Sequence, residues 1–211
     1  MKNMISLSIA LGLLASLAFV PGNEVKETLA VGSQAPLSAS KMENIDGKKL
    51  SLQDIKQSNG LLVIFSCNTC PFVVGTGDKE GWEGRYNGIS ADCKAKNIGM
   101  VLVNSNEAKR EKGDNLNDMK ARAEEMGYTM AYVLDKNSDL ANAFGATTTP
   151  HVFLFDKDLK LVYRGKIDEN VDNAANVKEP YLKNALQNLV DGKIIDPQET
   201  KSMGCSIKRA G

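Results

Sequence analysis

A Cys-x-x-Cys-Pro motif that directly follows an apolar stretch constrains this chain more than any other feature. The apolar stretch is Leu61 to Phe65, and the motif is Cys67-Asn68-Thr69-Cys70-Pro71. A continuous apolar run is typical of a central strand covered on both faces, and we expect the motif to open the helix that follows. Unpaired N–H groups and the macrodipole at the start of a helix stabilise an anion. A thiolate placed there has a lowered pKa and is a good nucleophile at neutral pH, so the motif predicts redox chemistry.

A zinc site and a purely structural pair of cysteines are the alternatives to redox chemistry at this motif. Zinc sites usually bring a second close pair of Cys or His ligands. Here the remaining cysteines, Cys93 and Cys205, stand singly and far apart, and the only histidine is His151. A structural pair stays open because a buried free cysteine behaves as a small hydrophobe. We expect a redox dithiol with no metal and no other cofactor.

The length and composition of the chain predict one domain with a sizeable core. The chain has 211 residues, of which 42% are apolar, and a chain of this length buries enough apolar surface for such a core. Basic and acidic residues balance, so the formal net charge is zero, and there is no basic stripe. The charge gives no indication of nucleic-acid binding, and we expect no nucleic-acid partner.

Residues 1–22 have the composition of a signal peptide. An apolar run from Ile5 to Val20 follows a weakly basic start and ends at Pro21-Gly22. This run is short for a membrane span, which needs about 20 residues, and suits a signal-peptide core. An uncleaved N-terminal anchor is the alternative, because tilting or a thin bilayer tolerates short spans. We therefore expect an exported, periplasmic or extracytoplasmic protein, with membrane contact only through such an anchor.

The rest of the chain predicts alternating strands and helices. Residues 23–36 form a linker or arm, residues 37–192 the folded domain and residues 193–211 a C-terminal tail. The expected strands lie at 61–65, 98–103, 130–134, 152–155 and 159–164. The expected helices lie at 51–55, 69–94 with a break near 75–77, 115–126, 138–144 and 179–190. This alternation predicts an α/β fold with a mixed central sheet flanked by helices.

Local signals predict the start of the domain and the role of one cysteine. Asp46-Gly47 is a turn dipeptide between short alternating segments, so residues 42–52 predict a β-hairpin ahead of the central strand. Ser51 is expected to cap the next helix, with Asp54 three residues on as in a capping box. Cys93 lies at helical spacing from apolar residues before it, which predicts a core residue rather than a ligand.

A Thr-Pro dipeptide before a second apolar strand completes a known arrangement. The order of strand, Cys-x-x-Cys, long helix and then Thr149-Pro150 resembles the thioredoxin superfamily over about Val31 to Val190. The N-terminal hairpin resembles the redoxin branch, meaning TlpA/ResA-like and AhpC/TSA proteins. The motif region, residues 161–168 and the tail Gly204-Cys205-Ser206-Ile207-Lys208 resemble a group of peroxiredoxin-like bacterial proteins. The resemblance implies a thioredoxin fold with an added N-terminal β-hairpin and a cis bond at Thr149-Pro150.

The resemblance also implies a thiol–disulfide oxidoreductase that reduces or exchanges disulfides in protein substrates; with the expected signal peptide, this would be an exported enzyme. Cys67, nearer the helix end and more exposed, would attack, and Cys70 would resolve the mixed disulfide. The oxidised form would carry a Cys67–Cys70 disulfide. Thr149 and Pro150 would pair with the incoming peptide, and the loop Asn68-Thr69 would lie beside the substrate and tune the thiolate. The implied partners are protein dithiol or disulfide substrates and an upstream redox partner.

Departures from the family patterns leave other functions open. Thioredoxin carries a buried acid six positions before its first cysteine, where this chain has Leu61, so a proton relay must come from elsewhere or from water. Peroxiredoxins carry Thr or Ser three positions before the reactive cysteine, where this chain has Ile64, and Thr149-Pro150 replaces their arginine. A thiol peroxidase of the AhpC/TSA type is the first alternative. A non-catalytic module that binds a metal or a partner is the second.

Cys205 lies beyond the last expected helix, in a polar segment. Gly204 and its polar neighbours predict a surface tail that adds no strand or helix to the core, and Cys205 would then be a thiol without chemistry. The alternative is a third redox thiol that docks near Cys67 or pairs with Cys93. An exported cysteine left unpaired tends to oxidise or to find a partner.

Overall fold

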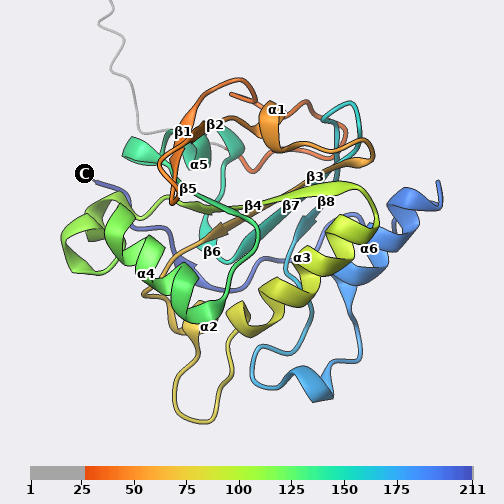
Figure 1. Cartoon of the computed structure of the whole chain (residues 1–211). Coiled ribbons are helices and arrows are strands. Elements are labelled where there is room, and N and C mark those ends of the chain that lie inside the picture. The colour runs from red at the N-terminus through yellow and green to blue at the C-terminus, as the bar shows by residue number, and fades with distance from the viewer. Residues whose placement is uncertain (1–26, 211) are drawn as a thin grey trace, which may run out of the picture.

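A computed structural model of the chain describes residues 27–210 (Figure 1). The expected signal peptide, residues 1–22, and residues 23–26 of the expected arm lie outside the described residues. Among the helices of the described part, none has the length and apolar character needed to cross a membrane. The described residues form a central sheet with helices on both faces.

The sheet has seven strands in the order β2-β1-β5-β4-β3-β7-β8. Its strands are β1 (Met42–Asn44), β2 (Lys49–Leu50), β3 (Gly60–Ser66), β4 (Ile98–Asn104), β5 (Ala131–Leu134), β7 (His151–Phe155) and β8 (Leu161–Gly165). β3, β4 and β5 run parallel, whereas β7 is antiparallel to β3 and β8 is antiparallel to β7. The hairpin of β1 and β2 extends the sheet beyond β5. The prediction of a mixed sheet with the thioredoxin fold and an added hairpin is confirmed.

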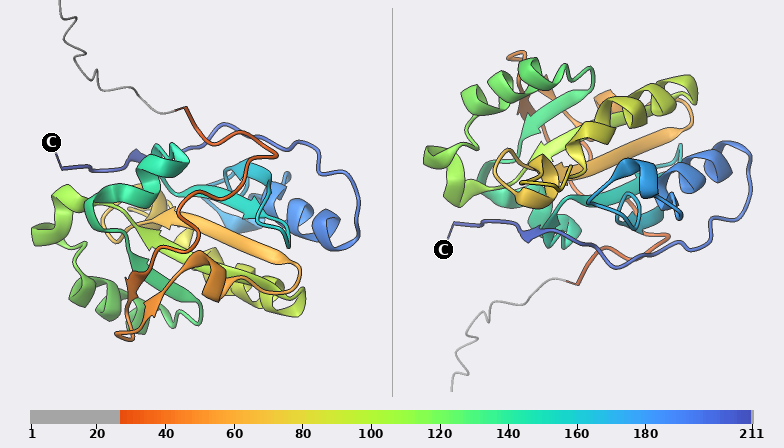
Figure 2. Two further views of the ribbon diagram at one scale, coloured as in Figure 1. Left: turned by 90° about the horizontal axis from the view of Figure 1, so that it is seen from above. Right: turned by 90° about the horizontal axis from the view of Figure 1, so that it is seen from below.

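Helices cover both faces of the sheet (Figures 1 and 2). They are α1 (Leu52–Ile55), α2 (Pro71–Val74), α3 (Tyr86–Ala95), α4 (Leu116–Met126), α5 (Asp139–Phe144) and α6 (Tyr181–Val190). α2, α3, α4 and α6 bury side chains in one core, the α3-side core. α1 and α5 bury theirs in the other, the α5-side core. β3 contributes to both cores, because successive side chains of a strand point to opposite faces.

The local predictions for the N-terminal part and for Cys93 are confirmed. Ser51 caps α1: its Oγ accepts a hydrogen bond from the Asp54 N–H at 3.3 Å, and the Asp54 carboxylate accepts one from the Ser51 N–H at 2.7 Å. This reciprocal pair is the predicted capping box. Cys93 of α3 is fully buried in the α3-side core.

The helix predicted over 69–94 is two helices, and the predicted break is confirmed. α2 ends before Gly75, which has a φ of 77° and where a Cβ atom would lie 2.4 Å from the Lys79 carbonyl oxygen. Glycine suits both the positive φ and the close approach. The predicted start of the helix is wrong, because α2 begins at Pro71, a residue favoured at the first helical position. Cys70 is therefore the N-cap residue of α2.

The prediction that the C-terminal tail adds no strand is also wrong. β9 (Cys205–Ser206) pairs antiparallel with β6 (Thr148–Thr149) in a second, two-stranded sheet. Ile207, the next residue, is buried in the α5-side core. In Figure 2 the C-terminal segment, in blue, runs from α6 back across the molecule toward α5. The polar residues around Ile207 hid this apolar anchor from the sequence pattern.

His151, at the start of β7, makes the stability of the fold depend on pH. Burial, together with the charge of Arg164, lowers the pKa of His151 to about 4. Its neutral Nδ1 accepts a hydrogen bond from the Thr147 N–H at 3.3 Å. Between about pH 6.5 and pH 4 the unfolded chain therefore binds a proton that the folded protein does not. Neutral His151 makes its full contribution to the free energy of unfolding above about pH 6.5. This free energy should fall by on the order of 3 kcal/mol as the pH decreases through this window.

The variant His151→Asn tests this dependence, because it keeps an acceptor near the position of Nδ1 and removes the titration. Urea unfolding at the two ends of the window should show a smaller acid loss in His151→Asn than in the wild type. The chain has one histidine, and the carboxylates titrate alike in both proteins, so the difference belongs to this side chain. Equal acid losses would contradict the lowered pKa.

Candidate dithiol site

The two cysteines of the motif lie in contact between the end of β3 and the start of α2. Both are buried, with 2% of Cys67 and 3% of Cys70 exposed. Thr149 of β6 contacts both: its Oγ1 is 3.2 Å from the Cys67 Sγ, and its carbonyl oxygen is 3.2 Å from the Cys70 Sγ. The Thr149–Pro150 peptide bond is cis, as predicted. The structure thus brings the motif and the Thr-Pro dipeptide together.

The premises of the predicted asymmetry between the cysteines are wrong. The sequence predicts that Cys67 is nearer the helix and more exposed, whereas Cys70 is the N-cap residue and the two are equally buried. The reason is Pro71, which begins the helix one residue after Cys70. The chemical roles of the two sulfurs must therefore be argued from their surroundings.

Hydrogen bonds shift the pKa values of the two cysteines in opposite directions. The Cys67 thiol donates to Cys70, and the thiol and N–H of Cys205 donate as well, which lowers the pKa of Cys70 to about 5 despite its burial. The pKa of Cys67 is raised well above its usual value by its hydrogen bond to Cys70, by burial and by the charge of Asp114. Only a protonated Cys70 could donate to the Thr149 carbonyl oxygen, and three donors outweigh this one acceptor. The lower pKa of the two is therefore that of Cys70, which favours a thiolate at this position.

All four cysteines are free thiols in the structure. The Cys67–Cys70 disulfide stays a prediction for the oxidised protein. Cys205 is half-buried, and its N–H lies 3.4 Å from the Cys70 Sγ. The tail cysteine therefore does dock at the motif, but its neighbour is Cys70 rather than Cys67.

A buried carboxylate, Asp114, holds the spacer between the cysteines. Asp114 is fully buried and accepts hydrogen bonds from the Asn68 N–H at 2.7 Å and the Thr69 Oγ1 at 2.8 Å. The amides of Asn104 and Asn106, at and just beyond the end of β4, donate to it at 2.8 and 3.1 Å. Four donors satisfy the charge, as the burial of a carboxylate requires.

The side chains of Asn68 and Thr69 are bonded to the protein itself. The Asn68 Nδ2 donates to the Gly113 carbonyl oxygen at 2.9 Å, and its Oδ1 accepts from the Tyr132 hydroxyl at 2.9 Å. The Thr69 hydroxyl donates its hydrogen bond to the Asp114 carboxylate. The contact with substrate that the resemblance implies for Asn68 and Thr69 stays a prediction, and so does that of Thr149 and Pro150, which are buried.

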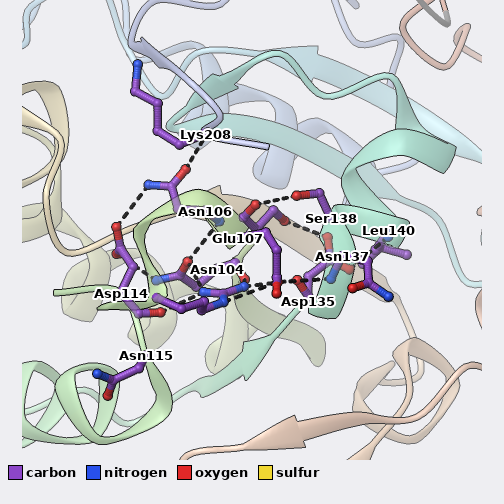
Figure 3. A network of polar contacts seen from close by, with 12 residues as sticks. Asn104, Asn106, Glu107, Asp114, Asn115, Asp135, Asn137, Ser138, Leu140 and Lys208 are labelled. Carbon is purple, nitrogen blue, oxygen red and sulfur yellow. Dashed lines mark hydrogen bonds and ion pairs between the residues drawn. The ribbon is translucent and has the colours of Figure 1, made fainter. Parts of the chain in front are cut away.

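The same network reaches the C-terminal segment (Figure 3). The Asn106 Oδ1 accepts a hydrogen bond from the Lys208 N–H at 2.9 Å. Arg110 donates to the Asn104 Oδ1 at 2.8 Å and to the backbone oxygen of Asp114 at 2.6 Å. The spacer, the end of β4 and the last residues of the chain are therefore joined by one set of polar contacts.

The sequence analysis missed Asp114 and its donors. Asp114 lies 46 positions after Asn68, so no local pattern links them. The run Asn104-Ser105-Asn106 after an apolar strand could have served as a signal, because the carboxyl ends of parallel strands meet at one sheet edge. Leu61 packs in the α5-side core, whereas the charge of Asp114 raises the pKa of Cys67. A buried acid therefore acts on the dithiol from elsewhere in the chain.

Asp114→Asn should destabilise the protein and lower the pKa of Cys67. An amide brings a donor to a point where donors already converge, so a buried group loses its partner, at a cost of about 1–3 kcal/mol. Removal of the negative charge takes away one cause of the raised Cys67 pKa. Urea unfolding, with the exposed Asp78→Asn as control, measures the first effect, and alkylation of Cys67 against pH measures the second. Equal free energies of unfolding for the two variants would contradict a role of Asp114 in holding the site together.

The fold and the dithiol define a redox protein of the thioredoxin fold, and comparison with known proteins gives its family. The Redoxin family model matches residues 30–179. The chain belongs to the Redoxin family. It is similar to an uncharacterized conserved protein from Geobacillus kaustophilus of solved structure, with 33% sequence identity, a TM-score of 0.77 and coverage of 86% of this chain and 93% of that one. Among curated proteins, none matches this chain.

More distant structures share the fold. A putative thiol:disulfide interchange protein DsbE from Chlorobium tepidum is 19% identical, with a TM-score of 0.54 over 78% of this chain and 98% of that one. Peroxidoxin BcpB from Mycobacterium tuberculosis is 13% identical, with a TM-score of 0.54 over 75% of this chain and 95% of that one. The predicted place in the redoxin branch of the thioredoxin superfamily is confirmed, and the function has to be argued from the site.

Proposed function

We propose that the protein is an exported thiol–disulfide oxidoreductase in which Cys67 and Cys70 exchange disulfides with protein substrates. The observation that carries the proposal is a buried pair of cysteines whose sulfurs lie together against Thr149, each 3.2 Å from an oxygen of that residue. Hydrogen bonds to Cys70 lower its pKa and raise that of Cys67, which favours the thiolate at Cys70. A thiolate is the nucleophile in disulfide exchange, and a second thiol beside it attacks the mixed disulfide and expels the substrate sulfur. Membership of the Redoxin family and a fold like that of a putative thiol:disulfide interchange protein support this class of reaction.

In the proposed reaction Cys70 attacks and Cys67 resolves, which reverses the roles predicted from the sequence. The Cys70 thiolate attacks a substrate disulfide, one substrate sulfur leaves, and a Cys70–substrate disulfide forms. The Cys67 thiolate then attacks the Cys70 Sγ and releases the second substrate sulfur. The substrate gains two electrons and two protons, one from Cys67 and one from water, and the protein keeps the Cys67–Cys70 disulfide. The upstream redox partner, a dithiol protein, restores the thiols.

The surroundings of Cys67 suit a thiol that becomes reactive only at the second step. The largest cause of its raised pKa is the hydrogen bond to Cys70. Once Cys70 is bound in a mixed disulfide it carries no charge, so this cause disappears and the pKa of Cys67 falls. The Thr149 hydroxyl, 3.2 Å from the Cys67 Sγ, is then placed to donate to the thiolate.

A thiol peroxidase, the alternative reaction, has no support at the positions that the family pattern requires. Ile64 stands three residues before Cys67 and packs in the α3-side core, so it offers no hydroxyl to a peroxide. A binding module remains the non-catalytic alternative. Within residues 27–210 no group of three or more His, Cys, Asp or Glu is arranged to hold a metal ion. Stoichiometric uptake of Cu(I) or Zn(II) without turnover would favour that module over the proposed enzyme.

Serine variants should separate the roles of the two cysteines. Cys70→Ser should abolish exchange, and Cys67→Ser combined with Cys205→Ser should trap substrates in mixed disulfides on Cys70, because no resolving thiol is then left beside Cys70. Cys93→Ala removes a buried cysteine outside the dithiol and should keep the activity. Insulin reduction measures the exchange, and non-reducing peptide mapping locates the trapped substrate. Trapping on Cys67 in Cys70→Ser would return the attacking role to Cys67.

The ultraviolet absorbance of the thiolate adds a direct measurement on the same variants. As the pH rises through about 5, the reduced wild type should gain one thiolate, because Cys70 loses its proton there. The step should vanish in Cys70→Ser and persist in Cys93→Ala, since burial raises the pKa of Cys93 to about 12. If the thiolate absorbance first rises at about pH 8.5, the ordinary thiol pKa, Cys70 is not a thiolate at neutral pH and the proposed role is contradicted.

The export part of the proposal rests on the apolar run of residues 5–20. The full chain, expressed in a Gram-negative host, should appear in the periplasm, and a variant that lacks residues 2–22 should stay in the cytoplasm. Cell fractionation and immunoblotting measure both. Recovery of the full chain in the membrane fraction would favour the uncleaved anchor, and recovery in the cytoplasm would exclude export.

A further inference from the structure

The C-terminal segment occupies the backbone edge beside the dithiol. We call residues 203–209 the C-terminal strap; it contains β9. Cys205 lies opposite Thr149 and Ser206 lies opposite Thr148 in the antiparallel pair of β9 and β6. Pairing of an extended segment with a strand edge is a common mode of peptide recognition. The strap therefore lies where the resemblance predicts a substrate peptide.

The residues that follow Cys205 fix the strap to the rest of the protein. Ile207 is 5% exposed in the α5-side core, and its N–H donates to the Thr147 carbonyl oxygen at 3.0 Å. The Lys208 N–H donates to the Asn106 Oδ1 at 2.9 Å, which links the strap to the network around the motif spacer. An apolar anchor and backbone hydrogen bonds thus fix the position of Cys205.

Gly204 brings the strap closer to β6 than another residue would allow. A Cβ atom at this position would lie 2.2 Å from the Thr149 carbonyl oxygen and 2.6 Å from its carbon. These are backbone atoms, which cannot swing aside as a flexible side chain can. A glycine at this point is therefore a requirement for the close approach of the next residue, Cys205, to the dithiol.

Cys205 connects a buried sulfur with the surface. Its N–H lies 3.4 Å from the Cys70 Sγ, and its thiol donates to the Cys70 sulfur. Cys70 is 3% exposed, whereas Cys205 is half-buried. A large partner such as a protein therefore meets Cys205 before it meets Cys70.

We propose that Cys205 is a third redox residue that carries the disulfide between the buried Cys67–Cys70 pair and protein partners. This inference rests on the proposed function and extends it. The Cys205 thiolate attacks the Cys70 Sγ of the Cys67–Cys70 disulfide, a Cys70–Cys205 bond forms, and Cys67 leaves and takes up the proton that Cys205 lost. No electron enters or leaves the protein in this step.

The Cys70–Cys205 disulfide then reacts with a substrate dithiol. A substrate thiolate attacks the Cys205 Sγ, and Cys70 leaves as a thiolate. The second substrate thiol attacks the substrate sulfur of this mixed disulfide and frees Cys205 as a thiol. The substrate loses two electrons and two protons and gains a disulfide, and the protein is left with three reduced cysteines. The same steps in reverse reduce a substrate disulfide.

The electrostatics of the site favour this order of events. Cys70 is the leaving group when a substrate thiolate attacks the Cys205 Sγ. A thiol of low pKa leaves faster in disulfide exchange, and the pKa of Cys70 is lowered to about 5. The pKa of Cys205 is raised to about 11 by burial, by its hydrogen bond to Cys70 and by the charge of Cys70. The last two causes vanish when Cys70 is part of a disulfide, so Cys205 becomes a better nucleophile when its attack is needed.

Disulfide mapping of Cys67→Ser tests whether the bond forms. With oxidised glutathione as oxidant, non-reducing peptide mapping of this variant should find a Cys70–Cys205 disulfide as the main product. Adding Gly204→Ala should strongly reduce it, because the new Cβ pushes the strap from β6, whereas adding Ser206→Ala should not. A Cys70 that is glutathionylated while Cys205 stays free would overturn the proposal.

Exchange kinetics of Cys205→Ser test whether the bond is used. Oxidation of a reduced protein substrate should slow by about tenfold or more, and this loss should be larger than any loss in the exchange of the Cys67–Cys70 pair with the small dithiol dithiothreitol. Equal losses with both partners would overturn the role of Cys205 as a carrier. Wild-type rates with both partners would overturn the role of Cys205 and leave the proposed function standing. A wild-type protein that exchanges with neither partner would overturn the proposed function, and this inference with it.

Discussion

The buried carboxylate of Asp114 is the interaction on which the arrangement of the dithiol depends. A carboxylate removed from water without partners is unfavourable by several kcal/mol, and this one is satisfied by four donors. Hydrogen bonds to a charged group contribute about 1.5–3 kcal/mol each. Two of the donors belong to the spacer between the cysteines and two to the end of β4. The positions of the cysteines are therefore set by the need to satisfy one charge as well as by apolar packing.

Hydrogen bonds, rather than a helix dipole, decide which sulfur carries the charge. α2 has four residues, so few peptide dipoles add up at its N-terminus. The Cys70 sulfur instead collects donors from Cys67 and from the strap residue Cys205. The segment that covers Cys70 is thus also the segment that stabilises its thiolate. Coverage and reactivity are coupled, because a movement of the strap would expose the sulfur and raise its pKa together.

The parts of the fold that the sequence predicts correctly are those whose signals are local. The buried strand β3, the hairpin turn at Asp46-Gly47 and the capping box of Ser51 depend on residues a few positions apart. The site depends on contacts between residues far apart in the sequence, which neither hydrophobic periodicity nor capping signals reveal. Asp114 and Asn68 are 46 positions apart, and Cys205 and Cys70 are 135 positions apart. The premise of the predicted attacking sulfur, that Cys67 lies nearer the helix and is more exposed, is wrong, and the prediction also omitted the distant donors.

The strap also limits how a protein partner can approach the dithiol. To pair with β6 as a peptide, a partner would have to displace β9 and extract Ile207, whose burial contributes about 1.5–3 kcal/mol. It would also break the backbone hydrogen bonds of the strap, each worth about 1 kcal/mol. Every 1.4 kcal/mol lost in this way weakens binding about tenfold. A partner that reacts at Cys205 avoids these losses, because the strap stays bound while its sulfur is exchanged. The geometry therefore favours the proposed transfer through Cys205 over displacement of the strap.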